Sequence, residues 1–171
     1  GRKKLVMLAK RHGIALRQSY EREGPTLSRR AGGYAHAKQF KRMKRVLRRQ
    51  RTLLGRVIRD IGRKLDGVDA SARETLQPWL QRAQRLYAQH RNDKGKLYAL
   101  HAPEVECIGK GKSRQPYEFG VKVGLAITAR KGLIVGARSF PGTPYDGDTL
   151  AEQLEQTEIL TGTKPKVAIV D

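Results

Sequence analysis

The segment YAHAKQFKRMKRVLRRQRTLLGRVIRDIGRKL (residues 34–65) decides how the first half of this chain folds. Its apolar side chains recur at steps of three and four residues, the spacing that places them on one face of an α-helix. These residues are Phe40, Met43, Leu47, Leu54, Val57, Ile61 and Leu65. Gln50 interrupts the stripe, which favours an antiparallel helical hairpin over a coiled coil. We therefore predict one long helix over residues 34–65 that packs along this face.

The chain before this helix is expected to form a shorter helix and a loop. Residues 1–16 have a basic amphipathic pattern, with Leu5, Leu8 and Ala9 on the apolar face. Residues 21–33 contain a Gly-Pro pair and a Gly-Gly pair, which are typical of loops. We expect the first range to be helical and the second to be irregular.

The chain after the long helix is predicted to form another helix. Ser71 is followed three residues later by Glu74, which is the pattern of a capping box at a helix start. Pro78 is expected to kink this helix or to reset its first turn, because proline lacks the backbone N–H that a helix interior uses. Residues 1–92 thus predict an all-helical unit with an apolar seam and a basic exterior.

Charge divides the chain into two halves. The formal net charge is +20 at pH 7. Residues 1–96 contain 27 Lys and Arg against 7 Asp and Glu, whereas residues 97–171 contain 9 of each. Such an asymmetry indicates two domains, a basic helical one over 1–96 and a neutral one over 97–171. A half this basic is typical of proteins that bind a polyanion, because Lys and Arg on phosphates release condensed counterions.

The neutral half alternates between strand and helix patterns. Residues 104–108 predict a short strand, and residues 117–128 predict a half-buried strand with strict apolar alternation. Residues 133–140 are expected to return as its antiparallel partner, followed by a helix over 149–162. The apolar run within 166–170 has no polar alternation and predicts a strand covered on both faces. The fold class expected is α+β or α/β, with a β-β-α-β order preceded by helices.

Two details of this half are also predicted. The buried face of the strand over 117–128 should carry its alternating apolar side chains, which are Phe119, Val121, Val123, Leu125 and Ile127. Asp146 or Asp148 is expected to cap the following helix, and Gly162 is expected to end it.

A run of basic residues on the long helix is the first candidate binding site. Eight of the fourteen residues over 38–51 are basic and none is acidic: Lys38, Lys41, Arg42, Lys44, Arg45, Arg48, Arg49 and Arg51. Like charges three and four residues apart repel one another on a helix, and a bound polyanion would relieve that repulsion. We expect contact with the DNA backbone here; the alternative is a solvated face, or acidic partners elsewhere in the intact protein. Lys110 and Lys112, in a Gly-containing loop, are a second candidate for phosphate contact, or else lie in a solvated turn.

The remaining reactive side chains point to no other chemistry. The chain has one cysteine, Cys107, and four dispersed histidines, so neither a disulfide nor a Cys- or His-rich zinc site is expected. Without a run of about 20 apolar residues or a signal peptide, we expect no membrane partner and a cytoplasmic location. Asp171, directly after the apolar run, is a candidate catalytic residue, because active-site groups often lie at strand ends in α/β proteins; the alternative is an ordinary loop or capping aspartate at a strand end.

The quoted segments resemble a known family. LYALHAPEVECIGKGKSRQPYEFGVKVGLAIT (97–128), GLIVGARSFPGTPYDGDTLAEQLEQ (132–156) and KVAIVD (166–171) are similar to the central part of bacterial insertion-sequence transposases of the DDE type. The region over residues 8–61 resembles the basic helical insertion of one subgroup of that family. The resemblance implies a partial ribonuclease H-like catalytic domain over 97–171 and a DNA-contacting insertion over 1–96.

In that family three carboxylates hold two divalent ions, Mg²⁺ or Mn²⁺, which clamp the attacking and leaving oxygens of a phosphodiester displacement. The resemblance carries only the second carboxylate onto this sequence, at Asp171, and places the other two outside the chain. It implies double-stranded DNA as the partner, a homodimer in the intact enzyme, and a bacterial, nucleoid-associated location. The chain would then be a fragment that binds DNA without cutting it. The alternative is a non-catalytic nucleic-acid-binding protein or an inactive transposon remnant.

Overall fold

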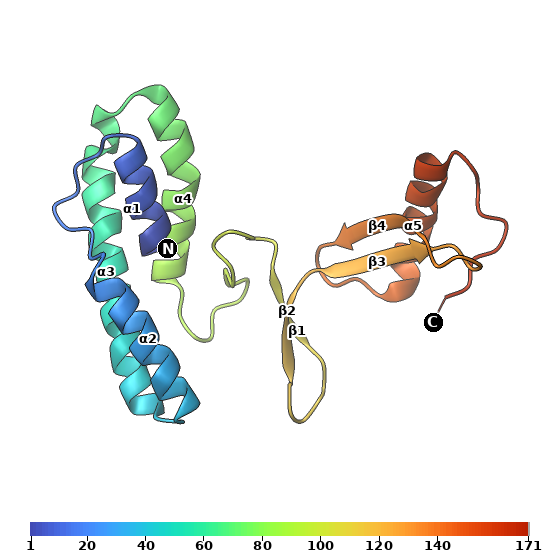
Figure 1. Ribbon diagram of the computed structural model, residues 1–171, viewed down its shortest axis with the longest axis horizontal. Helices are drawn as coiled ribbons and strands as arrows, with labels where there is room; N and C mark the ends of the chain where they lie inside the picture. The colour runs from blue at the N-terminus through green and yellow to red at the C-terminus, as the bar shows by residue number, and fades with distance from the viewer. Residues whose placement is uncertain (171) are drawn as a thin grey trace. The chain divides into compact units, whose positions relative to one another are not determined.

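The computed structural model describes residues 1–170, and Asp171 lies outside the described residues. The chain divides into two compact units, Gly1–His101 and Ala102–Asp171 (Figure 1). The first unit is helical and the second combines two small antiparallel sheets with one helix. This mixture confirms the α+β class.

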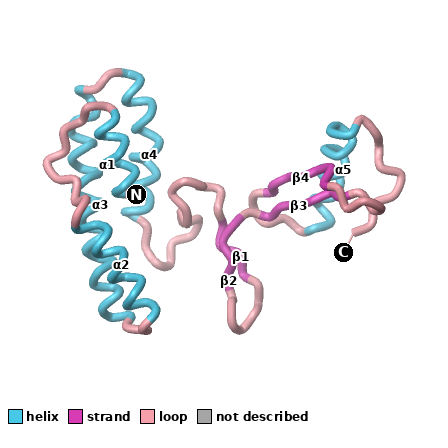
Figure 2. Tube along the Cα trace, viewed as in Figure 1, coloured by secondary structure: helices cyan, strands magenta, loops and turns pink. Residues whose placement is uncertain are grey.

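Four α-helices build the first unit (Figure 2). They are α1 (Arg2–Arg11), α2 (Glu23–His36), α3 (Phe40–Lys64) and α4 (Ala70–Ala88), with a short 3₁₀ turn, η1 (Leu65–Gly67), after α3. The apolar faces of α1, α3 and α4 meet in one core, whose fully buried side chains include Leu5, Ile61 and Leu76. The apolar faces predicted for residues 1–16 and for the second half of the long helix are therefore confirmed.

The loop predicted over residues 21–33 is wrong, because α2 runs through this segment. Pro25 lies in the first turn of α2, where the backbone N–H that proline lacks would have no helical partner in any case. The long helix consequently starts at Phe40 rather than at Tyr34, after a turn in which Lys38 has a positive φ of 54°.

α2 packs against the first half of α3 and forms a hairpin with it. Gln50 donates a side-chain hydrogen bond of 3.0 Å to the Ser28 hydroxyl of α2, which explains the break that Gln50 makes in the apolar stripe. Phe40, at the start of that stripe, remains 54% exposed because only one helix covers this half of α3.

The start of α4 differs from its prediction. The residue that caps the helix is Asp69, whose carboxylate accepts a hydrogen bond of 2.7 Å from the backbone N–H of Ala72. The capping box predicted at Ser71 is therefore wrong, and the cap lies two residues earlier. The Asp69 carboxylate does what the Ser71 hydroxyl was expected to do, because it accepts a hydrogen bond from a backbone N–H of the first helical turn. The helix starts at Ala70 and continues through Pro78 to Ala88, so Pro78 does not reset its start.

The second unit contains β1 (Glu106–Gly109), β2 (Tyr117–Gly120), β3 (Lys122–Ile127), β4 (Ile134–Phe140) and α5 (Asp146–Thr161). β1 pairs with β2, and β3 pairs with β4, both antiparallel, with Lys122 opposite Phe140. The single strand predicted over 117–128 is thus two strands, which separate at Val121 and pair with different partners. The antiparallel return over 133–140 is confirmed, and so is the helix that Gly162 ends in a left-handed conformation.

α5 covers the opposite face of the β3–β4 sheet from the one predicted to be buried. The covered face carries small residues such as Gly124 and Gly136, and a Cβ at Gly124 would lie only 2.7 Å from Oε1 of Gln153. The large apolar side chains of β3 lie on the other face, so Leu125 is 58% exposed, whereas Phe140 of β4 lies on the covered face and is buried. The prediction was wrong because α5 approaches the sheet more closely over glycines than it could over branched side chains.

The strand predicted within residues 166–170 is also wrong. This segment forms neither helix nor strand and pairs with no strand among the described residues, and Ile169 is 87% exposed. An apolar run can form a buried strand only where neighbouring strands supply hydrogen bonds to its backbone. Along the chain, the second unit therefore has the element order β-β-β-β-α rather than β-β-α-β.

Candidate nucleic-acid interface

The outward face of α3 is basic along almost its whole length. The basic residues on this face are exposed and follow one another at steps of three, four or eight residues. They are Lys41, Arg45, Arg48, Arg56, Arg59 and Arg63. We call this set the basic face. At a rise of 1.5 Å per residue it extends for about 33 Å, which is close to one turn of B-form DNA, about 34–36 Å.

All eight basic residues predicted over 38–51 are exposed in the structure. The side chains of five of them form no hydrogen bond or ion pair with any part of the chain that the structure describes; these are Lys38, Lys41, Lys44, Arg45 and Arg48. Lys38 lies in the turn before α3, and Arg42 donates a hydrogen bond of 3.0 Å to the Gln39 side chain. Free cationic side chains on one rigid helix can bind an extended polyanion without first breaking internal ion pairs.

The other two residues are already engaged. Arg49 forms a bidentate ion pair with Glu23 of α2, with nitrogen–oxygen distances of 2.6 and 3.0 Å. The hydrogen bond with Arg49 lowers the pKa of Glu23 below its ordinary value. The Arg51 guanidinium lies over the ring of Tyr87, 5.3 Å from its centroid. The helix hairpin therefore supplies an acidic partner that the sequence of residues 38–51 lacks.

Lys110 and Lys112 lie in the exposed loop between β1 and β2, in the second unit. The Lys110 ammonium lies 3.4 Å from the Glu118 carboxylate on β2, so its charge has a partner. Lys112 has none within residues 1–170. The loop thus presents one free lysine rather than two.

Arg56, Arg59 and Arg63 were missed by the sequence reasoning, which stopped at residue 51. Their signal was available, because they continue the three- and four-residue spacing of the basic face beyond Thr52. Asp60 lies between Arg59 and Arg63, so this part of the helix, unlike residues 38–51, contains an acidic residue. Since its side chain is buried rather than displayed on the basic face, it does not interrupt that face.

Four of the described carboxylates of the second unit have partners, namely those of Glu106, Glu118, Asp146 and Glu152. Glu106 accepts hydrogen bonds from the backbone N–H of Gly142 and the hydroxyl of Thr143. Asp146 lies 2.6 Å from the Lys122 ammonium, and no side chain caps α5, so the predicted aspartate cap is wrong. The helix starts at Asp146 itself, which places both candidate aspartates inside its first turn.

Within residues 1–170, no three His, Cys, Asp or Glu side chains lie close enough together to hold a metal ion. Asp171, the predicted metal ligand and catalytic residue, lies outside the described residues. None of the helices in this part of the chain combines the length and the apolar character that a membrane crossing requires.

No protein family, curated protein or solved structure matches this chain.

Proposed function

We propose that this chain binds double-stranded DNA through the basic face of α3. The observation that carries the proposal is the row of exposed cationic side chains on one helix face, several of them without internal partners. Duplex DNA presents a regular line of phosphates, and a rigid helix can offer charges to it at fixed spacing. Contact with the backbone rather than with bases is favoured, because such contacts need charge and position but no sequence-reading side chains.

The test is the salt dependence of DNA binding by the full chain. The variant carries Lys41→Gln, Arg45→Gln and Arg48→Gln, since glutamine keeps helix propensity and removes charge. If all three contact phosphates, the slope of log K against log salt becomes shallower by about 2.7. Fluorescence anisotropy with a labelled duplex of about 20 base pairs measures this slope.

The matched control removes the same charge away from the basic face, with Arg91→Gln, Lys94→Gln and Lys131→Gln, all exposed residues. The control should keep a slope near that of the parent chain. Equal losses in both variants would mean that only net charge attracts DNA, and the basic face would then lose its assigned role.

We further propose that the chain is part of a DDE-type transposase. The resemblance over residues 97–128, 132–156 and 166–171 supports this, together with a basic helical unit followed by a neutral unit of strands and a helix. In such an enzyme Asp171 would be one of three carboxylates that hold two Mg²⁺ or Mn²⁺ ions, within a ribonuclease H-like domain. The intact protein would act as a homodimer at the nucleoid.

Sequencing the DNA on both sides of the coding segment tests this second proposal. An upstream strand that ends in Asp and a downstream helix that carries Glu would complete the three-carboxylate site. A stop codon or frameshift in either flank would instead identify an inactive remnant, for which DNA binding alone remains to be tested.

A further inference from the structure

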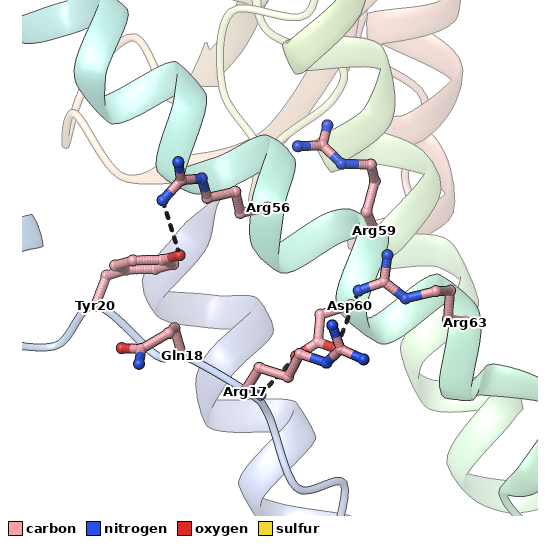
Figure 3. Close-up of a pocket in the computed structure, with 7 residues that line it drawn as sticks. All are labelled: Arg17, Gln18, Tyr20, Arg56, Arg59, Asp60 and Arg63. Carbon is pink, nitrogen blue, oxygen red and sulfur yellow. Dashed lines mark hydrogen bonds and ion pairs between the residues drawn. The ribbon is translucent and has the colours of Figure 1, made fainter.

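A pocket forms where the loop between α1 and α2 crosses the second half of α3 (Figure 3). Its volume is about 330 Å³. Arg17 and Tyr20 line it from the loop. From α3 the pocket receives Arg56, Arg59, Asp60 and Arg63. Arg59, Asp60 and Arg63 follow Arg56 by three, four and seven residues, so all four lie on one face of α3.

Asp60 holds the loop in place and is itself neutralised. Its Oδ2 accepts a hydrogen bond of 2.7 Å from the backbone N–H of Arg17. Its Oδ1 lies 3.4 Å from the Arg63 guanidinium and 3.2 Å from the Lys64 ammonium. Lys64 also donates to the carbonyl of Ala15, which fixes the loop at a second point. Both carboxylate oxygens of Asp60 therefore have partners. Asp60 does not pair with the guanidinium groups of Arg17 and Arg59, which stay available to an anion.

Among the groups of the lining, the guanidinium groups of Arg17 and Arg59 and the hydroxyl of Tyr20 can still donate a hydrogen bond to an incoming anion. The guanidinium groups of Arg17 and Arg59 have no hydrogen bond or ion pair with residues 1–170. Arg56 donates to the Tyr20 hydroxyl oxygen over 3.4 Å, which leaves the hydroxyl proton free to donate in turn. Four arginines and one aspartate give the lining a formal charge of +3. Gln18 also lines the pocket from the loop, and its side-chain amide forms no hydrogen bond with residues 1–170.

We propose that this pocket binds a phosphate group. Guanidinium groups form bidentate, charge-assisted hydrogen bonds with phosphate oxygens, and a tetrahedral anion can accept such bonds from several directions at once. The donors here come from two separate segments, the loop and α3. A carboxylate has only two oxygens in one plane and would leave part of this set unpaired.

The phosphate could belong to a DNA backbone or to a free anion. Arg56, Arg59 and Arg63 also belong to the basic face, so the pocket lies at the end of the proposed DNA-binding surface. In its DNA form the inference rests on the proposed function: the pocket fixes one backbone phosphate, and with it the register of the duplex along α3. In its free-anion form it stands independently.

The test uses the full chain with Arg17→Gln and Arg59→Gln, which removes the two unpaired guanidinium groups. The control carries Arg91→Gln and Lys94→Gln, a loss of equal charge outside the pocket. Far-UV circular dichroism and thermal denaturation check that both variants fold. One probe is inorganic phosphate, followed through the arginine side-chain NMR signals; the other is a labelled duplex, followed by anisotropy across a salt series.

We expect the pocket variant, but not the control, to bind phosphate about tenfold more weakly, and its DNA salt slope to become shallower by about 0.9–1.8, the range for one to two lost phosphate contacts. Phosphate binding that only the pocket variant loses, with an unchanged DNA slope, would assign the pocket to a free anion. If the parent chain binds phosphate but no DNA, the proposed function fails and the pocket stands. Absence of phosphate binding by the parent chain, or equal losses in both variants, would overturn the inference.

Discussion

Asp60 is the only acidic residue of α3, and it is also one of the few charged side chains that the fold buries, at 4% exposure. Burial by itself would raise the pKa of Asp60, but the hydrogen bond from the Arg17 N–H, together with Lys64 and Arg63, outweighs it and lowers the pKa below its ordinary value. A carboxyl group whose pKa is lower in the folded state stabilises the fold at pH values above its ordinary pKa. That stabilisation is lost as the pH falls through the lowered value.

Replacing Asp60 by Asn is expected to lower the free energy of unfolding at pH 7 by about 1.5–3 kcal/mol, the usual size for hydrogen bonds to a charged group. The side-chain NH2 group of asparagine is a hydrogen-bond donor, and it would lie next to the Lys64 and Arg63 cations, which need an acceptor. Denaturant titrations at pH 7 and at a series of acidic pH values measure the loss, which should shrink as Asp60 of the parent chain becomes protonated.

The control is Asp66→Asn, because the side chain of Asp66 is 97% exposed and contacts only Arg73, at 3.5 Å. Its effect should stay within about 0.5 kcal/mol. Equal denaturation midpoints for Asp60→Asn and the parent chain would contradict the anchoring role given to Asp60.

At the scale of elements, α3 and α4 approach each other closely at Gly55. A Cβ built there would lie 2.6 Å from Cε2 of Tyr87, so the ring could not keep its place. Tyr87 in turn lies beneath Arg51, which links this contact to the basic residues of α3. The packing of the two helices therefore depends on a residue without a side chain.

Gly55→Ala is expected to destabilise the protein by about 1–3 kcal/mol through overpacking, reduced by the gain of about 1 kcal/mol that alanine brings to a helix. Thermal denaturation followed by circular dichroism measures the net change. The control lies in the same helix: a Cβ at Gly62 meets nothing within 4 Å. Gly62→Ala should raise stability by up to about 1 kcal/mol, and destabilisation of the same size in both variants would contradict the close contact.

At the scale of the whole molecule, the two units differ in how much apolar surface they bury. The first unit contains all of the buried hydrophobic side chains among the described residues except Phe140. The second unit instead exposes large apolar side chains on one face of its β3–β4 sheet, including Val123, Leu125 and Ile127. Because apolar burial is the main favourable contribution to folding, the second unit should be the less stable of the two.

Hydrogen exchange of the full chain, read by mass spectrometry, should separate the two units. We expect the slowest amide exchange in α1, α3 and α4, and exchange faster by at least about tenfold, or 1.4 kcal/mol, in β3, β4 and α5. Equal protection in both units would show that the second unit draws stability from somewhere other than its own apolar core.

The sequence alone determined the elements whose pattern is local. The apolar spacing in residues 1–11 and 54–61 specified which helix faces are buried, and Gly162 specified where α5 ends. The exposed basic residues of α3 were equally readable, because charge at helical spacing needs no knowledge of the rest of the chain.

Tertiary structure decided what depends on distant partners. α2 forms across a Gly-Pro and a Gly-Gly pair because α3 covers it, and residues 117–128 divide at Val121 because each half pairs with another strand. The ion pair between Glu23 and Arg49, and the arginine pocket, join residues more than 25 positions apart. Local periodicity carries no information about such pairs, because their free energy comes from contacts that exist only once the chain has folded.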